Sequence, residues 1–183
     1  MTDLTATPPA DLLSILIAPH AVLKARAKPV LDRDADRVRA LIPRMFATMY
    51  HAPGIGLAAP QIGESLRMAI VDVAEGDARQ PLVLVNPEIL AASTELATRE
   101  EGCLSLPQQY ADVTRPARIK IRFEDADGMR RELEADGLLA TCIQHEIDHL
   151  NGVLFVDHIS ALKRNMIMRK LAKEQRIKAA ERG

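Results

Sequence analysis

Gln144-His145-Glu146-Ile147-Asp148-His149-Leu150 is the most informative stretch of this chain, because it predicts both a helix and a metal site. Two histidines four residues apart lie on one helix face, one turn apart, so both imidazoles can reach a single ion. A glutamate directly after the first histidine lies beside that ion, where it can exchange a proton with water. Apolar residues at 143, 147 and 150 predict that the helix is buried, and buried imidazoles and carboxylates need partners.

Two histidines leave a catalytic metal site one protein ligand short of the usual three. The third histidine of a metzincin layout would fall at Phe155, so that layout fails. A thermolysin-like layout requires a glutamate farther along the chain, and Glu174 is the available candidate. His158 is a further candidate, although the adjacent Asp157 indicates a polar turn.

The two cysteines differ as candidate ligands. Cys142 shares the helix face, but at about 1.5 Å rise per residue it lies roughly 10 Å from His149 along the axis, too far for both to bind one ion. We therefore expect Cys142 to line the site. Cys103, in Glu101-Gly102-Cys103-Leu104-Ser105-Leu106-Pro107, is better placed as a ligand on a loop or strand edge. On the residues alone, Cys103, Glu174 and His158 all remain open as the third ligand.

The composition of the 183-residue chain favours one globular domain and excludes several classes of function. Aromatic residues make up only 3% of the sequence, so a surface that binds nucleic acid by base stacking is not expected. The sequence has no run of 18 apolar residues and no signal-peptide pattern, so we expect neither a membrane span nor export. Two cysteines are too few for a disulfide scaffold, which fits a reducing cytoplasm.

The hydrophobic pattern predicts strands and helices that do not alternate as βαβ units. Helices are expected over 32–50, 137–150 and 160–182, and strands over 67–73, 82–85, 117–123 and 130–134. Asn86-Pro87 is expected to end the second strand, and Asp127-Gly128 to form a hairpin turn. Segment 53–63 is predicted to be a loop and residues 1–11 a flexible leader. The predicted fold is a single catalytic α+β domain over 1–183, with mixed or antiparallel strands around a central metal-binding helix and a C-terminal helix.

Three segments, in order, resemble the signature motifs of the peptide deformylase family. They are Gly54-Ile55-Gly56-Leu57-Ala58-Ala59-Pro60-Gln61, Glu101-Gly102-Cys103-Leu104-Ser105 and the helix segment 144–150. Any one could occur by chance, whereas all three in this order are specific, and the similarity extends from about Ile15 to the C-terminal helix. The long helical tail resembles the bacterial type I class. The early segment 18–24 departs from the family's usual pattern, which affects only the expected surface and N-terminal packing.

The resemblance implies a metal-dependent hydrolase that removes the N-formyl group from the formyl-methionine of nascent proteins and releases formate. It implies that Cys103, His145 and His149 bind one metal ion per chain. That ion is Fe²⁺ in the family, and Zn²⁺, Ni²⁺ or Co²⁺ can replace it. A thiolate and two imidazoles suit several first-row ions, so the sequence does not choose among them.

The resemblance also implies roles for three further residues in catalysis. Glu146 would take a proton from the attacking water and return it to the leaving amine. The side-chain amide of Gln61 and the backbone N–H of Leu104 would stabilise the oxyanion. Glu101 is expected to support the site through Arg115 rather than to react.

The glycines of the first two motifs leave backbone accessible to a peptide. We expect the substrate to lie there as an added strand, bonded to the backbone of Ile55, Gly56 and Gly102. Its methionine side chain would need an apolar pocket, with walls predicted at Ile55, Leu138, Cys142 and the His145 ring. Ordinary core packing is the alternative explanation for Leu138.

The C-terminal segment is basic, while the rest of the chain is acidic. Residues 163–183 contain eight Lys/Arg and two Glu, a net charge of +6, which leaves −7 for the remainder. We expect Ile159, Leu162 and Met166 to dock the start of the tail on the body. The basic residues beyond them would face outward and could bind ribosomal RNA, although a merely solvated helix face is the alternative.

Two other functions remain open at this level. An ordinary His-Glu-x-x-His metallopeptidase would require a third ligand other than Cys103. A non-catalytic metal-binding module would not require Gln61 and Glu146 in addition to the metal ligands. The sequence predicts a chain without a membrane partner, and we expect a monomer.

Overall fold

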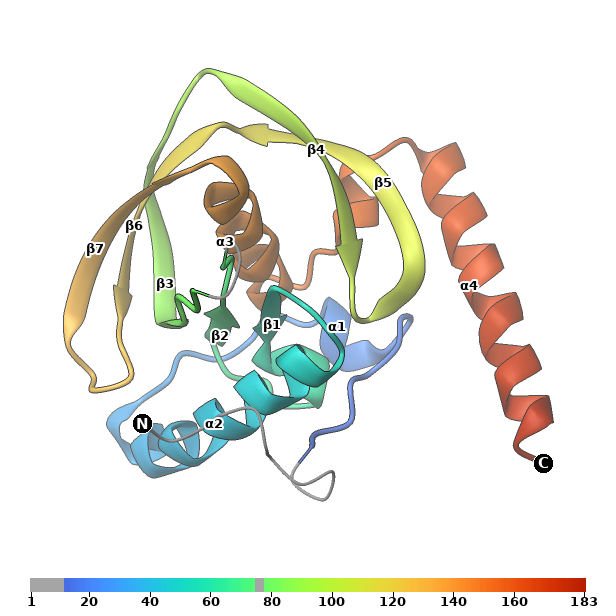
Figure 1. Ribbon diagram of the computed structural model, residues 1–183, viewed down its shortest axis with the longest axis horizontal. Coiled ribbons are helices and arrows are strands. Elements are labelled where there is room, and N and C mark those ends of the chain that lie inside the picture. Colours follow the sequence, from blue (N-terminus) through green and yellow to red (C-terminus); the bar gives the residue numbers. More distant parts are fainter. Residues whose placement is uncertain (1–11, 75–77) are drawn as a thin grey trace.

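The computed structural model describes residues 12–74 and 78–183, and it contains two antiparallel sheets with a helix between them (Figure 1). The larger sheet has the order β1-β2-β3-β6-β7, formed by Gly56–Ala58, Met68–Val71, Leu82–Ala92, Arg118–Glu124 and Arg130–Asp136. The smaller sheet pairs β4 (Leu96–Cys103) with β5 (Leu106–Pro116). The helices are α1 (Ala21–Lys24), α2 (Ala35–His51), α3 (Gly137–Leu150) and α4 (Ala161–Glu181), with short 3-10 turns at Asp32–Asp34, Ala59–Ile62 and Phe155–His158. The predicted α+β class is confirmed.

Helix α3 forms the centre of the molecule, with the limits predicted from the sequence. Ile143 and Leu150 are fully buried, and Ile143 belongs to the apolar cluster formed with Leu84 and Ile121 of the larger sheet. Arg67, just before β2, donates a hydrogen bond of 2.9 Å from Nη1 to the carbonyl of Leu150 at the end of the helix. A cationic side chain at a helix C-terminus is favourable, so the helix is fixed at its end as well as along its apolar face.

A second apolar cluster joins α2 to strands β1 and β2. Met45 and Met49 of α2 are fully buried with Leu57 and Ile70. The predicted helix over 32–50 is observed as a 3-10 turn at 32–34 followed by α2. This cluster supports the segment after α2, which leads into the first sequence motif.

The prediction that Asn86-Pro87 ends a strand is wrong. β3 continues through this pair to Ala92, with a register shift between Val85 and Glu88. Asn86 has a φ of 49°, and its side-chain amide bonds both the N–H and the carbonyl of Val30 at 2.8 and 2.9 Å. These bonds stabilise a β-bulge at a position where the local sequence alone predicts the end of the strand.

Strands β4 and β5 were not predicted from the sequence. Only Glu101 of the eight β4 residues is buried, and half of them are exposed, among them Thr98, Arg99 and Glu100. Such a strand lacks the alternation of apolar and polar residues that marks a half-buried strand. The pairing with β5 is set instead by contacts with distant parts of the chain, described below.

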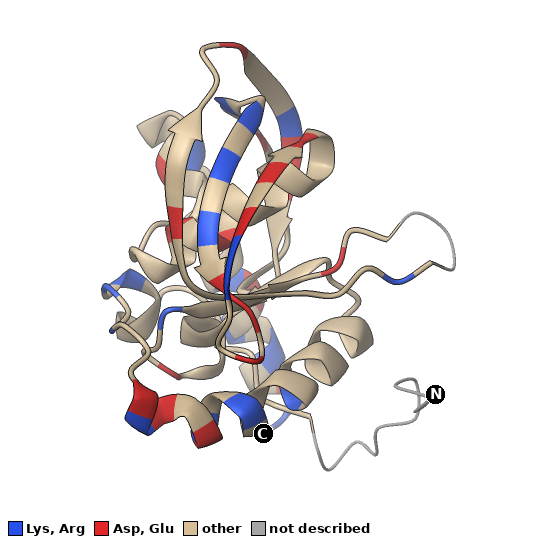
Figure 2. Cartoon of the chain, turned by 90° about the vertical axis from the view of Figure 1, so that its left-hand side faces the viewer, with Lys and Arg blue, Asp and Glu red and all other residues tan. Residues whose placement is uncertain are grey.

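The outer face of β6 and β7 carries cross-strand ion pairs. Lys120 and Arg122 of β6 lie 3.5 and 3.4 Å from carboxylate oxygens of Glu132 on β7. Figure 2 shows the blue positions of one strand beside the red positions of its neighbour. Ile119, Ile121 and Phe123 point to the core, so the predicted half-buried strand is confirmed. Exposed pairs of this kind contribute little stability, and they mark the solvent side of the sheet.

Helix α4 docks on the body, but two of the three residues predicted to make this contact do not make it. Leu162 and Met166 are 68% and 59% exposed, so their predicted docking is wrong. The fully buried residue of α4 is Leu171, which packs in a third cluster with Leu106 and Phe155. Ile159, just before α4, packs against the same cluster, as predicted.

No helix in the described ranges 12–74 and 78–183 is both long and apolar enough to cross a membrane. The predicted flexible leader lies outside the described residues.

Gly152, after α3, is expected to tolerate no side chain. Its φ is +75°, and a Cβ would lie 2.4 Å from the carbonyl oxygen of Lys24. We predict that Gly152→Ala lowers the free energy of unfolding by about 1–2 kcal/mol from left-handed strain, plus about 1–3 kcal/mol from the overlap. Urea unfolding at matched metal content, with an unchanged slope, would measure the loss.

Gly128 provides the matched control for that prediction. It has a similar φ of +77°, but a Cβ there would meet nothing within 4 Å. Gly128→Ala should therefore cost only the backbone strain. Equal losses for the two variants would show that the approach of Lys24 to Gly152 is unimportant.

Candidate active site

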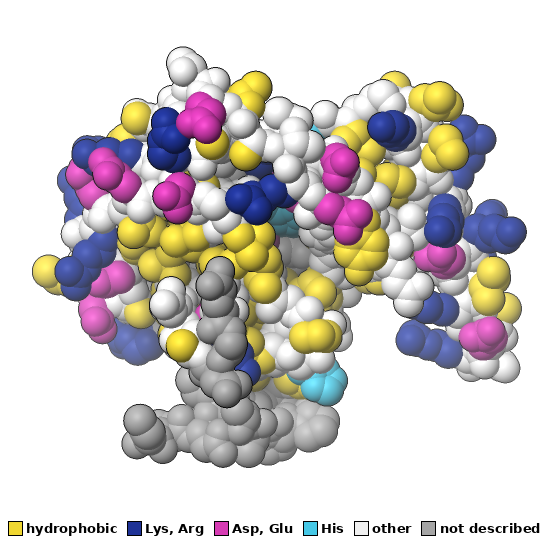
Figure 3. All heavy atoms as spheres, turned by 45° about the horizontal axis from the view of Figure 1, so that its top comes forward, with side chains coloured by type: hydrophobic (Ala, Val, Ile, Leu, Met, Phe, Trp, Pro, Cys, Tyr) yellow, Lys and Arg dark blue, Asp and Glu magenta, His cyan; other side chains and the backbone are white. Residues whose placement is uncertain are grey.

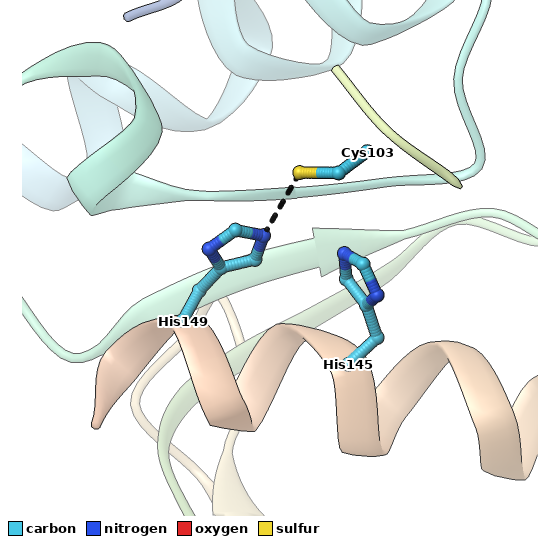
Figure 4. Close-up of side chains that lie close together, drawn as sticks. All are labelled: Cys103, His145 and His149. Atoms are coloured by element: carbon cyan, nitrogen blue, oxygen red, sulfur yellow. Dashed lines mark hydrogen bonds between the residues drawn. The ribbon is translucent and has the colours of Figure 1, made fainter. Parts of the chain in front are cut away.

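Three potential metal ligands meet above helix α3. His145 and His149 project from one face of the helix, and Cys103 reaches them from the end of β4 (Figure 4). The Cys103 sulfur lies 3.3 Å from Nε2 of His149, and the ligand atoms of the three residues lie within 4.8 Å of one another. That spacing is close to the span of two metal–ligand bonds of about 2.0–2.3 Å each.

The donor set fits a first-row metal ion. A thiolate and two imidazoles are typical ligands of such ions. Burial holds the pKa of His149 well below its usual range, so its ring is neutral, as ligation requires. Among the described residues, Nδ1 of His149 and Oε2 of Glu146 are buried side-chain atoms with no hydrogen-bond partner. Unpaired buried polar atoms are rare, and the free Oε2 of Glu146 beside the ligands indicates a place for a further group, whereas Nδ1 of His149 is on the side of the ring away from Cys103.

The alternative third ligands are engaged elsewhere. Glu174 on α4 accepts a hydrogen bond of 3.2 Å from Gln109, and His158 lies 2.7 Å from the carboxylate of Asp148. Neither belongs to the cluster of possible ligands. Phe155 is buried with its ring stacked near that of His145, at 6.3 Å between centroids. Cys142 lines the adjacent cleft and lies outside the cluster, as expected from the helix geometry.

Gln61 lies beside the cluster in a fixed orientation. Its Oε1 accepts a hydrogen bond of 2.9 Å from the backbone N–H of Ala58, which assigns the two ends of the amide. Its Nε2 then lies 3.5 Å from the Cys103 sulfur and donates to the hydroxyl of Ser105 at 3.1 Å. Gln61 is buried, with 1% of the residue exposed. A donor is therefore held beside the ligands, at a position where it can reach a group bound there.

Glu146 and Leu104 complete the surroundings of the cluster. Glu146 is 2% exposed, and burial raises the pKa of its carboxyl to about 7. A carboxyl with this pKa can both accept and donate a proton near neutral pH. Leu104 lies in the two-residue turn that joins β4 to β5, directly after Cys103, and it lines the cleft beside the cluster.

A buried network connects the cluster to the hairpin formed by β4 and β5. Nδ1 of His145 lies 2.9 Å from Glu101, which also receives two hydrogen bonds from Arg115 at 2.7 and 2.9 Å. Arg115 donates a third to Asp148 at 2.8 Å, and Asp148 also contacts His158. The expected support of Glu101 through Arg115 is therefore present. Burial alone would raise the pKa of the Glu101 carboxyl, but the bonds from His145 and Arg115 outweigh it and lower the pKa to about 2.

A cleft of about 650 Å³ opens beside the cluster. Every predicted substrate residue lines it: Ile55, Gly56, Gly102, Leu138 and Cys142. Ile55 and Leu138 are 45% and 47% exposed, so Leu138 is not ordinary core. Figure 3 shows a hollow on this face, bordered by apolar and acidic side chains. A Cβ at Gly56 would lie 2.9 Å from Glu146, so the glycine lets the backbone of β1 pass close to the carboxylate.

Several residues of the cleft were missed by the sequence analysis. Glu100 and Tyr110 line its mouth, and Ser105 holds Gln61 from within the second motif. Asp148 lies inside the helix motif, yet its link to Arg115 was not foreseen. Motif membership could have indicated Ser105 and Asp148, whereas Tyr110 is found only once β4 and β5 are paired.

The fold and the site together define a metal-dependent hydrolase. A family model described as polypeptide deformylase matches residues 12–165. The peptide deformylase of Brucella suis biovar 1 (strain 1330) is 54% identical over 160 residues, which cover 87% of this chain and 91% of that protein. The peptide deformylase of Agrobacterium fabrum (strain C58 / ATCC 33970) is 53% identical over 165 residues, covering 90% and 96%.

Solved structures agree with the sequence relatives. The crystal structure of a peptide deformylase from Legionella pneumophila has a TM-score of 0.85 at 47% identity, covering 92% of this chain and 98% of that one. A peptide deformylase from Synechococcus elongatus in complex with actinonin has a TM-score of 0.81 at 44% identity, covering 91% and 88%. The chain belongs to the peptide deformylase family.

Removing Arg115 should destabilise the protein, because Glu101 and Asp148 would lose the guanidinium that they share and keep only their histidine partners. Arg115 is 5% exposed. We predict that Arg115→Met lowers the free energy of unfolding by about 3–5 kcal/mol, the usual cost of breaking a buried ion pair. The exposed pair of Arg118 with Glu95 is the control, and Arg118→Met should cost less than about 1 kcal/mol. Similar losses for the two variants in urea unfolding would contradict a special role for the buried network.

The same network should make stability depend on pH. The folded pKa of Glu101, about 2, is below its ordinary value of 4.5. A carboxylate whose pKa is lowered by folding stabilises the folded state at pH values above its ordinary pKa. This stabilisation is lost as the pH falls from about 4.5 through about 2. In Arg115→Met the carboxyl keeps the bond from His145 but loses those from Arg115, so its folded pKa lies closer to 4.5 and stability should fall less between pH 4.5 and 2 than in the unmodified protein. Unfolding curves between pH 2 and 6 that run parallel for the two proteins would exclude this link.

Proposed function

We propose that this chain hydrolyses the amide bond that joins the formyl group to the N-terminal methionine of nascent proteins and so releases formate. The observation that carries the proposal is the convergence of Cys103, His145 and His149 beside the buried carboxylate of Glu146, in a cleft that a peptide can enter. Membership of the peptide deformylase family supports the same reaction. Formate release from a formyl-Met peptide, without cleavage of its internal peptide bonds, is the direct test.

We propose Cys103, His145 and His149 as the ligands of one metal ion per chain. When bound, such an ion polarises the formyl carbonyl and lowers the pKa of a water molecule. The proposal of Fe²⁺ rests on the family, and Zn²⁺, Ni²⁺ or Co²⁺ would suit the same ligands. Elemental analysis of protein purified without oxygen should find iron. Zinc in its place would overturn that choice and leave the ligands unchanged.

We propose Glu146 as the group that moves the proton. It would accept a proton from the attacking water and donate it to the amine that leaves with the methionine. Its pKa of about 7 suits both steps near neutral pH. Its unpaired Oε2 supports this role, because one carboxylate oxygen is free to bond a water or an amine.

We propose that Gln61 and Leu104 stabilise the negative charge that develops on the formyl oxygen. The side-chain Nε2 of Gln61 is oriented by Ala58 and held close to the Cys103 sulfur. The backbone N–H of Leu104 follows directly in the turn. Two preorganised donors in a site screened from water stabilise an oxyanion far more than solvent donors do.

We propose that the substrate binds as an extended strand between β1 and β4. Ile55 and Gly56 would bond it on one side and Gly102 on the other, since both strands end their sheets at the cleft. The methionine side chain would then point toward α3, between Leu138, Cys142 and the His145 ring.

Glu146→Gln separates proton transfer from metal binding. The amide keeps the size of the side chain and can still bond a water, but it cannot accept and return a proton. We predict full metal content and a fall in turnover of about 10²–10⁴-fold. Metal analysis paired with formate release would measure both. A variant with full metal and near wild-type turnover would remove Glu146 from the mechanism.

His149→Ala provides the contrast to that variant. It removes a proposed ligand, so metal and activity should be lost together. Retention of metal by His149→Ala would contradict the ligand set while leaving the proposed reaction to be judged from formate release by the unmodified protein.

We propose that α4 binds ribosomal RNA and that the protein acts as a monomer in the cytoplasm, where nascent chains emerge. Arg169, Lys170, Lys173, Arg176 and Lys178 are exposed, and basic side chains gather at the α4 side of Figure 3. Because Leu171 is buried, truncation would disturb the body. The better test is the triple change Lys170→Gln, Lys173→Gln and Arg176→Gln. Ribosome co-sedimentation at low salt should weaken, and unchanged binding would exclude the contact.

A further inference from the structure

Tyr110 presents an exposed aromatic ring at the mouth of the active-site cleft. It is 62% exposed and lines the cleft together with Gly102. A Cβ at Gly102 would lie 2.6 Å from Cε1 of Tyr110, so the ring lies directly over the glycine. The missing side chain at Gly102 therefore lets the ring extend from β5 across β4, toward the strand edge that faces the cleft.

The ring lies on the outer face of the two-stranded sheet. Glu101 and Cys103 point inward, because they contact His145 and His149 at 2.9 and 3.3 Å. Side chains alternate along a strand, so Gly102 faces outward. Tyr110 is the direct partner of Gly102 in the pairing of β4 with β5, and direct partners share a face.

Acidic side chains surround this ring. Glu100 and Asp112 are the next outward pair of the same sheet, directly opposite each other, and both are exposed. Like charges directly opposite each other are destabilising. In the part of the chain that the structure describes, neither carboxylate takes part in a salt bridge. Glu100 also lines the cleft, so its charge lies beside the path of the substrate.

A peptide bound along β4 must present one of its side chains to this surface. β4 pairs only with β5 among the described strands, which leaves its second edge open to the cleft. In an extended peptide, successive side chains point to opposite faces at about 3.3 Å per residue. With methionine directed inward, toward α3, the side chain of the next residue points outward, to the face that carries Tyr110.

We propose that Tyr110 and Glu100 form a subsite that selects a basic side chain at the residue following the formyl-methionine. The aliphatic stem of a lysine would lie on the ring, with its ammonium group near the carboxylate of Glu100 and within reach of the π face. The inference rests on the proposed deformylase function and adds a preference to it. A glutamate at the same position would meet the two carboxylates and be disfavoured.

Formyl-Met-X-Ser peptides with X as Lys, Ala or Glu test this subsite, with kcat/KM measured from formate release. The unmodified protein should favour Lys over Ala by about three- to fivefold and Lys over Glu by about tenfold at low salt, as exposed cation–π and ionic contacts allow. Tyr110→Ser should bring the Lys-to-Ala ratio close to one, and Tyr110→Phe should retain it. Glu100→Gln should reduce mainly the Lys-to-Glu ratio and its dependence on salt.

Leu96→Ala is the matched control. Leu96 is 61% exposed, belongs to the same outward face, and lies six residues from Gly102 at the far end of β4. Its substitution should leave every ratio unchanged. A Tyr110→Ser variant that loses activity equally for all three peptides would show that the ring only supports Gly102, and would overturn the subsite. Unmodified protein that treats the three peptides alike would also overturn it, whereas no formate from any peptide would refute the proposed function itself.

Discussion

The site depends on the hydrogen bonds that the buried guanidinium of Arg115 donates. This guanidinium holds Glu101 of β4 and Asp148 of α3 at once, and Glu101 in turn holds His145. Cys103 lies two residues beyond Glu101, so the same bonds determine where its sulfur meets the two histidines. A strand with few buried side chains is thus tied to the central helix by charge-assisted hydrogen bonds rather than by apolar packing.

Burying these groups is unfavourable in itself, which explains how completely they are paired. Glu101 and Arg115 are about 95% buried, and each would destabilise the fold without the other. Glu146 and His149 differ, because each keeps a buried atom without a partner among the described residues. The network therefore satisfies the supporting groups and leaves unsatisfied those next to the reaction, which is the arrangement that a reactive site requires.

The cleft exists because two strand edges are left unpaired on either side of α3. β1 ends the larger sheet and β4 has only β5 as a partner, so both present backbone groups to a peptide. Glycines at 56 and 102 keep these edges narrow, and the second also makes room for the ring of Tyr110. Exposed edges invite unwanted pairing. Here β1 is short and only the last four residues of β4 line the cleft, so these edges are open mainly to an extended ligand bound in it.

The sequence by itself determined helix α3, its limits and its histidine pair. The hydrophobic period of 3.6 residues and the residues that begin and end a helix are features of one continuous segment. Three ordered motifs also indicated the family. Taken alone, the residues left Cys103, Glu174 and His158 as possible third ligands, and they gave no sign of β4 and β5. Only the tertiary structure brought Cys103 to a helix 42 positions away, carried Tyr110 over Gly102 and buried Leu171 instead of Leu162. Such contacts depend on strand pairing and packing between distant segments, which no local pattern encodes.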